Sequence, residues 1–325
     1  MKMKFFFLKV LFFISFSNNM MSLLYAPVQR QTMFSTQIAE MSQIPGTSHF
    51  NKDKAIKQFS CETQNTFLEN AKIPQKDNSL VRIMTYNIHF WKSPDKKNDN
   101  MKKMIAIIKK INPDILILQE VSPHTIGCGA FENSQAMTSL KRLGFSDFSA
   151  CNTIAGSGGW FGNVIASKIK FKNRCRFYFE KQISKKQTRC YATAQLQIAS
   201  QKKELDVFGT HLESKGKNSI RKAQIEQIVE DIQKDFAHNN SFIAGDFNAA
   251  RKSSVIKFLE KNGFKDCFSY MNWKHPLYTH WTGQEIDFIF LSPNWNLPLA
   301  GCYVYYDSAS DHLPIIMDIQ LERQN

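Results

Sequence analysis

The sequence predicts a mixed-sheet α/β sandwich, and three observations support this fold class. Short hydrophobic runs of the kind found in strands alternate along the chain with amphipathic helical segments. No glycine-rich dinucleotide fingerprint accompanies them, which disfavours a Rossmann fold. The chain has 325 residues, of which 43% are hydrophobic and 13% aromatic, so it is able to bury a full core. We therefore expect a layered domain of about 250 residues.

The first predicted strand, at 80–88, alternates apolar and polar residues as a half-buried strand does. A helix is predicted over 100–111, where methionine and isoleucine recur at three- and four-residue steps. The Asn-Pro-Asp sequence at 112–114 ends this helix, because proline cannot continue it. The apolar run at 115–118 then predicts a buried strand.

The same alternation of strand and helix continues through the rest of the chain. Its members are the strands 205–210, 242–244, 286–291 and 313–319 and the helices 220–232 and 253–259. Polar side chains stand at or just beyond the ends of these hydrophobic segments. These positions are where we expect a functional site.

A set of side chains suited to metal binding and proton transfer occupies these strand ends. Its members are Asn87, Glu120, His211, Asp246, Asn248, Asp287, Asp311 and His312. Taken singly, each residue has a structural explanation, since Asp and Asn are common in turns and a histidine can be part of a core. Their joint occurrence indicates a divalent-metal phosphodiesterase, a reaction that needs a hard cation, a base and donors to phosphate oxygens.

Three of these residues are the predicted metal ligands. Glu120 and Asp311 offer carboxylates, and Asn87 offers an amide oxygen. Oxygen ligands of this kind suit Mg²⁺, or Mn²⁺ in its place. No thiolate ligands and no paired-histidine spacing in the sequence indicate zinc.

The remaining residues are the predicted catalytic groups. His312 is a candidate base, with Asp287 as the carboxylate that fixes its tautomer. Asp246 and Asn248 would position the attacking water. Because Asp246 and His312 could both lie near that water, the base is either Asp246 or His312. His211 would stabilise the pentacovalent phosphate or protonate the leaving oxygen.

A series of short motifs resembles, in the same order, those of the endonuclease/exonuclease/phosphatase superfamily, which includes deoxyribonuclease I. These are Thr85-Tyr86-Asn87, Leu118-Gln119-Glu120-Val121, Gly162-Asn163-Val164-Ile165-Ala166-Ser167, Thr210-His211-Leu212, Gly245-Asp246-Phe247-Asn248, Ile286-Asp287-Phe288-Ile289-Phe290 and Ser310-Asp311-His312. The resemblance implies a four-layer α/β/β/α sandwich of two mixed β-sheets flanked by helices, with the active site at one edge. It implies the same roles for the site residues.

Within that superfamily, one region resembles the tyrosyl-DNA phosphodiesterase 2 branch. The sequence His211-Leu212-Glu213-Ser214 is followed on the next helix by Arg221 and Gln224. Phe247 and Tyr86, however, stand where that branch usually carries Thr and Trp. The motifs therefore indicate the chemistry and leave the substrate open.

The charge of the chain favours partners that carry phosphate. The formal net charge is +14 and the pI is near 9.4. Basic residues follow two of the predicted site motifs, namely Lys215, Lys217, Arg221 and Lys222 after the first and Arg251 and Lys252 after the second. They favour nucleic acid as the substrate.

The alternatives are a secreted sphingomyelinase-like phospholipase C acting on an anionic or sphingomyelin-containing membrane, and an inactive member that binds nucleic acid or membrane. No protein partner is predicted.

The chain is expected to have three parts. Residues 1–26 are predicted to be a signal peptide, because lysines precede an apolar stretch at 5–16 that is short for a membrane span. Residues 27–79 are predicted to be a linker or loosely ordered extension, and 80–322 to be the catalytic domain. We expect export, to the periplasm or outside the cell, with membrane association through the N-terminus as the alternative. The seven cysteines include no CxxC pair and leave disulfide pairing open.

Overall fold

The computed structural model describes the greater part of the chain beyond residue 72. The described residues are 73–76, 78–122, 134–154, 160–183, 188–198, 203–236, 240–275 and 278–321. The predicted signal peptide at 1–26 and most of the predicted linker at 27–79 lie outside them. None of the helices in the described part is both long enough and apolar enough to cross a membrane.

Two six-stranded sheets form the centre of the domain. The first has the order β11-β12-β1-β2-β4-β3, and the second has the order β5-β6-β7-β8-β10-β9. The first contains β1 (Leu80–Asn87), β2 (Ile115–Val121), β3 (Asp147–Ile154), β4 (Trp160–Ser167), β11 (Leu299–Val304) and β12 (Ile315–Gln320). The second contains β5 (Phe171–Tyr178), β6 (Cys190–Ile198), β7 (Lys203–His211), β8 (Asn240–Asp246), β9 (Lys265–Asp266) and β10 (Asp287–Leu291). Each sheet mixes parallel and antiparallel pairs, as predicted.

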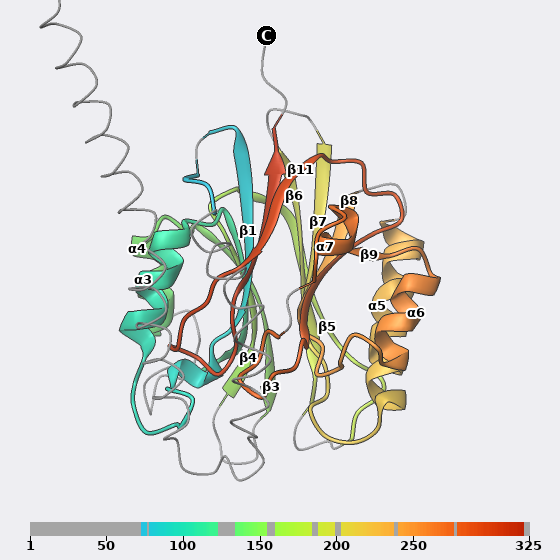
Figure 1. Ribbon diagram of the computed structural model, residues 1–325, viewed down its shortest axis with the longest axis horizontal. Helices are drawn as coiled ribbons and strands as arrows, with labels where there is room; N and C mark the ends of the chain where they lie inside the picture. Colours follow the sequence, from blue (N-terminus) through green and yellow to red (C-terminus); the bar gives the residue numbers. More distant parts are fainter. Residues whose placement is uncertain are drawn as a thin grey trace, which may run out of the picture. The chain divides into compact units, whose positions relative to one another are not determined.

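Helices cover the outer faces of the two sheets. They are α3 (Met101–Ile111), α4 (Gln135–Arg142), α5 (Asn218–Asp235) and α6 (Ser254–Lys261). The described part also contains the short helix α7 (Cys267–Tyr270) and a 3-10 turn, η1 (His89–Trp91). Figure 1 shows α3 and α4 beside the first sheet and α5 and α6 beside the second. Strands β1, β2 and β4 of the first sheet contact β7 and β8 of the second. The order helix, sheet, sheet, helix confirms the predicted four-layer sandwich.

Each helical layer is held by its own apolar cluster. On α3, Met104 and Ile108 belong to the same buried cluster as Leu118 of β2, which accounts for the helical periodicity in the sequence. On α5, Ile225 and Ile228 belong to the cluster that covers the second sheet. Burying one such side chain contributes roughly 1.5–3 kcal/mol, so these faces fix the helices to the sheets.

The two sheets also meet through a close approach and a covalent link. A Cβ atom at Gly209 of β7 would lie 2.9 Å from the Ile117 side chain of β2, so glycine lets the sheets pack tightly here. A disulfide joins Cys151 of β3 to Cys190 of β6, which the sequence left undetermined. Cys175 is exposed and free. The disulfide therefore links one sheet to the other.

Candidate active site

Two pairs of parallel strands bring their carboxyl ends to one edge of the sandwich. In the first sheet β1 runs parallel to β2, with Asn87 opposite Gln119, so Glu120 follows directly beside Asn87. In the second sheet β7 runs parallel to β8, with His211 opposite Asp246. The predicted residues at the ends of four strands therefore lie together because of the sheet register.

Two antiparallel strands deliver the remaining residues to the same edge. Strand β10 pairs with β8 so that its first residue, Asp287, lies opposite Asp246. Strand β12 pairs with β1, with Ile315 opposite Thr85, so the residues just before β12 reach the end of β1. Ser310 fixes this approach, because its hydroxyl donates to the Asn87 carbonyl at 2.8 Å.

The predicted residues gather around a single cavity of about 380 Å³. Its lining includes Glu120, His211, Asp246, Asn248, Asp311 and His312. The other two predicted residues lie against this lining, since Asn87 Nδ2 donates to Asp246 Oδ2 at 3.0 Å and Asp287 contacts His312. The structure thus brings the whole predicted set together.

The carboxylate of Asp246 lies in contact with several other polar groups of the cavity. Its Oδ1 accepts the Asn248 backbone N–H at 2.8 Å, and its Oδ2 accepts from Asn87. The same Oδ2 lies 3.4 Å from His211 Nε2 and 3.7 Å from His312 Nε2. Burial alone would raise the pKa of Asp246, but the two imidazoles and the hydrogen bonds hold it below its usual value.

Gly245 gives the chain the conformation that presents Asp246. Its φ is +143°, a backbone region that side chains rarely adopt. A Cβ atom there would also lie only 1.9 Å from the Thr210 carbonyl oxygen. The glycine of the Gly-Asp-Phe-Asn motif is therefore required by the turn itself.

His312 is held by a buried carboxylate, as the sequence predicted. Its Nδ1 lies 2.8 Å from Asp287 Oδ2, and the Thr279 hydroxyl donates to the same oxygen at 2.7 Å. The Thr279 oxygen in turn accepts the Asp287 backbone N–H at 3.0 Å, so the carboxylate is clamped. Burial would lower the pKa of His312, but Asp287 and Asp246 outweigh it and raise the pKa to about 10.

His211 has the opposite protonation state. Burial, together with the nearby Arg189 guanidinium, lowers the pKa of His211 to about 3, so this imidazole is neutral at pH 7. Arg189 is itself buried, with Nη2 donating to the Ser214 hydroxyl at 2.9 Å and lying 3.9 Å from Glu213. Sequence reasoning missed Arg189, because it stands just before β6 without a local motif.

Glu120 occupies an irregular point of its strand. The register between β2 and β4 shifts between Leu118 and Val121, and Glu120 has a φ of +56°. Bulges of this kind often re-aim a side chain at a functional site. Glu120 Oε2 is buried without a hydrogen-bond partner, and burial followed by the charge of Asp311 raises the pKa of Glu120 to about 7.

Asp311 lies between two histidines that sequence reasoning did not identify. Its Oδ2 is 3.4 Å from His89 Nε2 and 3.8 Å from His280 Nε2. Burial opposes ionisation, but the contact with His280 and the charge of His312 hold the pKa of Asp311 well below its usual value. His89 follows Asn87 by two residues, which was the one local signal available; His280 had none.

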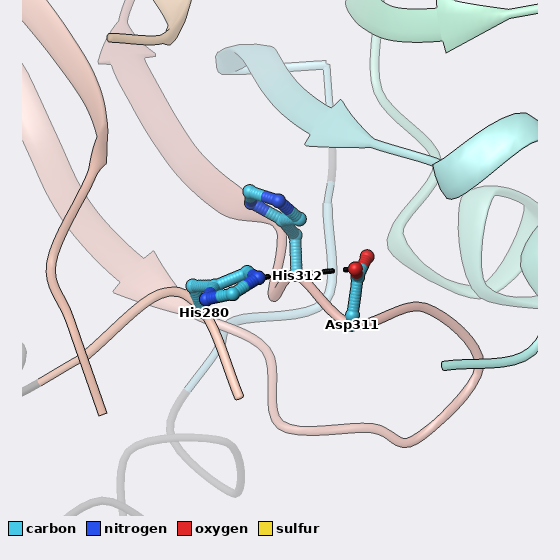
Figure 2. Close-up of side chains that lie close together, drawn as sticks. All are labelled: His280, Asp311 and His312. Atoms are coloured by element: carbon cyan, nitrogen blue, oxygen red, sulfur yellow. Dashed lines mark ion pairs between the residues drawn. The ribbon is translucent and has the colours of Figure 1, made fainter. Parts of the chain in front are cut away.

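The cavity contains groups of side chains with the spacing of metal ligands. One group is Asp246, Asp287 and His312, and a second is His280, Asp311 and His312. Within each, the ligand atoms all lie within 4.8 Å of one another. Figure 2 shows Asp311 and His280 facing one another with His312 beside them.

The unpaired oxygen of Glu120 tests whether a cation fits here. A buried carboxylate oxygen without a partner is costly, and a second carboxylate, Asp311, raises that cost. A divalent cation bound between Glu120 and Asp311, with Asn87 nearby, would give the Glu120 oxygen a partner and would offset the repulsion between the two carboxylates. The residues present therefore fit a divalent metal.

One predicted basic residue does not present its charge to the surroundings. The Arg251 guanidinium donates to both carboxylate oxygens of Glu285 at 2.6 Å and to Asp266 at 3.0 Å. Its charge is neutralised inside the protein, so the expectation that Arg251 attracts a phosphate backbone was wrong. Lys215 and Lys217, beyond His211, are exposed.

A cluster of carboxylates and imidazoles at one edge of a four-layer sandwich defines a phosphoesterase-like site. The family model described as the Endonuclease/Exonuclease/phosphatase family matches residues 84–312. The chain therefore belongs to the endonuclease/exonuclease/phosphatase family. It is a phosphoesterase of that family. No curated protein matches the chain in sequence.

Several solved structures share the fold. An endonuclease/exonuclease/phosphatase from Beutenbergia cavernae is 20% identical, with a TM-score of 0.61 over 75% of this chain and 72% of that one. The human Nocturnin catalytic domain with bound sulfate is 20% identical, with a TM-score of 0.60 over 76% of this chain and 97% of that one. Truncated Caenorhabditis elegans TDP2 is 20% identical, with a TM-score of 0.55 over 74% and 97%. The tyrosyl-DNA phosphodiesterase 2 branch is thus one of several structural neighbours.

Proposed function

We propose that this protein is a divalent-metal-dependent phosphodiesterase that hydrolyses phosphodiester bonds in nucleic acid. The observation that carries the proposal is the single cavity in which Asp246 and His312 face Glu120 and Asp311. Phosphodiester hydrolysis requires a base, a proton donor and a cation site within reach of one phosphate. All three are available here.

The two candidate bases differ in protonation. With its pKa raised to about 10, His312 carries a proton at neutral pH, whereas Asp246 is ionised. Asp246 is therefore the group able to accept a proton from the attacking water, while Asn248 holds its carboxylate in place. His312 is then able to donate a hydrogen bond to a phosphate oxygen.

The other groups of the cavity would stabilise the negative charge of a bound phosphate. A divalent cation held by Asn87, Glu120 and Asp311 would neutralise charge on the phosphate and polarise its P–O bond. Neutral His211 is able to donate one hydrogen bond to the phosphorane, and the buried Arg189 behind it adds a fixed positive charge.

Charge and the structural neighbours support nucleic acid as the substrate class. The chain carries a net charge of +14, and exposed Lys96 lines the cavity itself. Exposed Lys215 and Lys217 extend the positive charge from the His211 side. Among the fold neighbours are Nocturnin with bound sulfate and ANGEL2, a 2′,3′-cyclic phosphatase. An anionic backbone fits such a surface.

The proposal is tested by a substrate panel with Mg²⁺, with Mn²⁺ and with EDTA. Single- and double-stranded DNA, RNA and 5′-tyrosyl oligonucleotides are the substrates. We expect cleavage with a divalent metal and none with EDTA. Asp246→Asn should lower kcat/KM by roughly 10²–10⁴-fold, the usual range for loss of a general base. The matched control is Asp235→Asn, an exposed carboxylate at the end of α5, which should behave like the wild type.

A second substrate class has one observation in its favour. Phe177 and Tyr178 are exposed at the carboxyl end of β5, and Ile183 follows them, also exposed. Tyr178 pairs with Cys190, which places this apolar group at the same edge as the cavity. Sphingomyelin vesicles therefore belong in the panel. Phosphocholine release without oligonucleotide cleavage would favour the phospholipase alternative, and an Asp246→Asn variant equal to wild type throughout would favour an inactive binding protein.

Export is part of the same proposal. The Cys151–Cys190 disulfide supports it, since structural disulfides are typical of oxidising compartments. N-terminal sequencing of the mature protein tests this point. A new terminus after Ser17 or Ala26 would agree with cleavage of a signal peptide, whereas retention of Met1 would contradict it.

A further inference from the structure

A row of exposed side chains runs along the edge strand β5. Strand β5 is the outermost strand of the second sheet, and its residues from Lys172 to Tyr178 are all exposed. The pairing of β5 with β6 is regular beyond the irregularity at 171–173, so the side chains alternate between the two faces of the strand there. Arg174, Arg176 and Tyr178 therefore lie on one face.

The contacts of these side chains show that this face is turned toward the first sheet. Arg174 Nη1 donates to the Phe148 carbonyl. The Tyr178 hydroxyl donates to the Asn152 carbonyl at 3.1 Å. Both acceptors belong to β3, the edge strand of the first sheet, which contacts β5. The two arginines and the tyrosine thus line the side of the sandwich where the two edge strands meet.

This side of the sandwich is continuous with the active-site edge. Tyr178 pairs with Cys190, at the end of β6 that lies beside the carboxyl end of β7. The next residue, Phe179, donates its backbone N–H to the Arg189 carbonyl at 3.2 Å, and Arg189 Nη2 donates to Ser214, which lines the cavity. Strands β5 and β7 are two strand spacings apart, which places Tyr178 about 10 Å to the side of the end of β7.

The chemistry of this row matches a single strand of nucleic acid. Successive side chains on one face of a strand are about 6.6 Å apart, which is close to the separation of neighbouring phosphates in an extended nucleic-acid strand. A guanidinium has five N–H donors, so the bond to Phe148 leaves Arg174 with donors for phosphate oxygens. Tyr178 is 48% exposed, and its ring offers a stacking surface for a base. Lys172 is not part of the row, since it pairs with Glu204.

We propose that Arg174, Arg176 and Tyr178 form a track for a single strand of nucleic acid that leads to the active-site cavity. This deepens the proposed function and rests on nucleic acid being the substrate. The two guanidinium groups bind successive phosphates, and the tyrosine ring stacks on a base nearer the cavity. Because such contacts do not read base identity, the track favours long substrates over short ones without a preference for sequence.

Fluorescence anisotropy with a labelled twelve-nucleotide oligothymidylate tests the track. The full-length protein is used with Mg²⁺ in the Asp246→Asn background, which keeps the proposed metal ligands and slows cleavage. Combining Arg174→Gln with Arg176→Gln should weaken binding by about tenfold or more at low salt. The slope of log Kd against log salt should fall by about 1.4, since each lost phosphate contact on a single strand removes about 0.7.

The matched control combines Lys102→Gln with Lys109→Gln. These lysines are exposed on α3, which lies beside the first sheet (Figure 1), and their replacement changes the net charge by the same amount. We expect this control to bind the oligonucleotide like the Asp246→Asn parent. An equal loss of affinity in the two double variants would show that only net charge matters and would overturn the proposal.

Tyr178 is tested separately, because its ring and its hydroxyl have different roles. Tyr178→Ala should weaken binding by roughly 5- to 150-fold, the range for loss of one stacked base. Tyr178→Phe keeps the ring and should bind like the parent. Equal weakening in both variants would assign the effect to the hydroxyl and contradict stacking. Binding of phosphatidylserine vesicles that depends on the arginines, without binding of the oligonucleotide, would identify a lipid surface and overturn the track.

A short substrate separates this inference from the proposed function. Bis(p-nitrophenyl) phosphate is too short to reach β5, so the double arginine variant of the otherwise wild-type enzyme should hydrolyse it at the wild-type rate. The same variant should cleave the oligonucleotide with a raised KM and an unchanged kcat. Hydrolysis of both substrates without regard to the arginines would overturn the track and leave the proposed function standing. Oligonucleotide binding that depends on the arginines, without hydrolysis of any nucleic acid, would do the reverse.

Discussion

Two Asp–His pairs in this protein differ in the closeness of their contact and in the direction in which the pKa of the histidine is shifted. In the cavity, Asp287 Oδ2 lies 2.8 Å from His312 Nδ1, and the pKa of His312 is raised to about 10. Away from the cavity lining, Asp266 Oδ1 lies 3.4 Å from His275 Nδ1, and the pKa of His275 is lowered. Both pairs even have a hydroxyl nearby, Thr279 in the first and Ser269 in the second.

The difference comes from the contact within each pair and from the other charges around it. At His312 the charge of Asp287, followed by that of Asp246, overcomes the effect of burial on the pKa, and the hydrogen bond to Asp287 adds to it. For His275, burial lowers the pKa, Asp266 opposes it, and the neighbouring Arg251 lowers it further. An Asp–His contact therefore does not by itself define a catalytic pair. The hydrogen bond and the surrounding charges decide whether the imidazole is protonated at neutral pH.

The largest expected effect separates the two pairs by activity. Asp287→Asn should lower kcat by roughly 10²–10⁴-fold, because His312 loses the carboxylate that orients its ring and raises its pKa. Asp266→Asn should leave kcat nearly unchanged, since Asp266 is not part of the cavity lining. Steady-state kinetics on whichever substrate the panel identifies measures both. Equal losses of kcat in the two variants would contradict the claim that only the Asp287–His312 pair takes part in catalysis.

A smaller effect is expected on stability when Arg251 is replaced. Arg251→Met leaves Glu285 and Asp266 as buried carboxylates without their cation. We expect a loss on the order of 3 kcal/mol, read from urea unfolding. In the same variant the pKa of His275 should rise, because the nearby positive charge is gone, and NMR titration of the ring protons measures it. A pKa of His275 that stays low would mean that burial alone sets it.

The smallest expected effect is a difference in how the two histidines make the stability of the folded protein depend on pH. His312 has a folded pKa above its unfolded value, so its stabilisation is present below about pH 6.5 and is lost as the pH rises toward about 10. His275 has a lowered folded pKa, so its contribution is lost as the pH falls below about 6.5.

Thermal unfolding of the metal-free protein at a series of pH values measures this difference. His312→Gln should flatten the alkaline decline in Tm, and His275→Gln should flatten the acidic one. Identical pH profiles for the two variants would contradict the opposite signs.

Much of the fold was visible in the sequence where apolar periodicity was strong. The helix that contains Met104 and Ile108 and the strand that contains Ile117 were predicted, because one face of each is buried. Strand β5 was indicated by a different pattern, since basic residues interleaved with Phe171 and Phe177 favour a solvated edge strand; β5 lies at the edge of its sheet, and all of its residues after Phe171 are exposed. Its position is set by backbone pairing with β6.

The sequence by itself determined which residues end the buried strands, and so the set around Asp246, His312 and Glu120. Short-range patterns suffice for that, because a strand and the residue after it are adjacent in the chain. Only the tertiary structure decided that His89 and His280 flank Asp311, that Glu285 neutralises Arg251, and which histidines carry a proton. These properties depend on burial and on charges brought together from distant segments, and no local pattern records them.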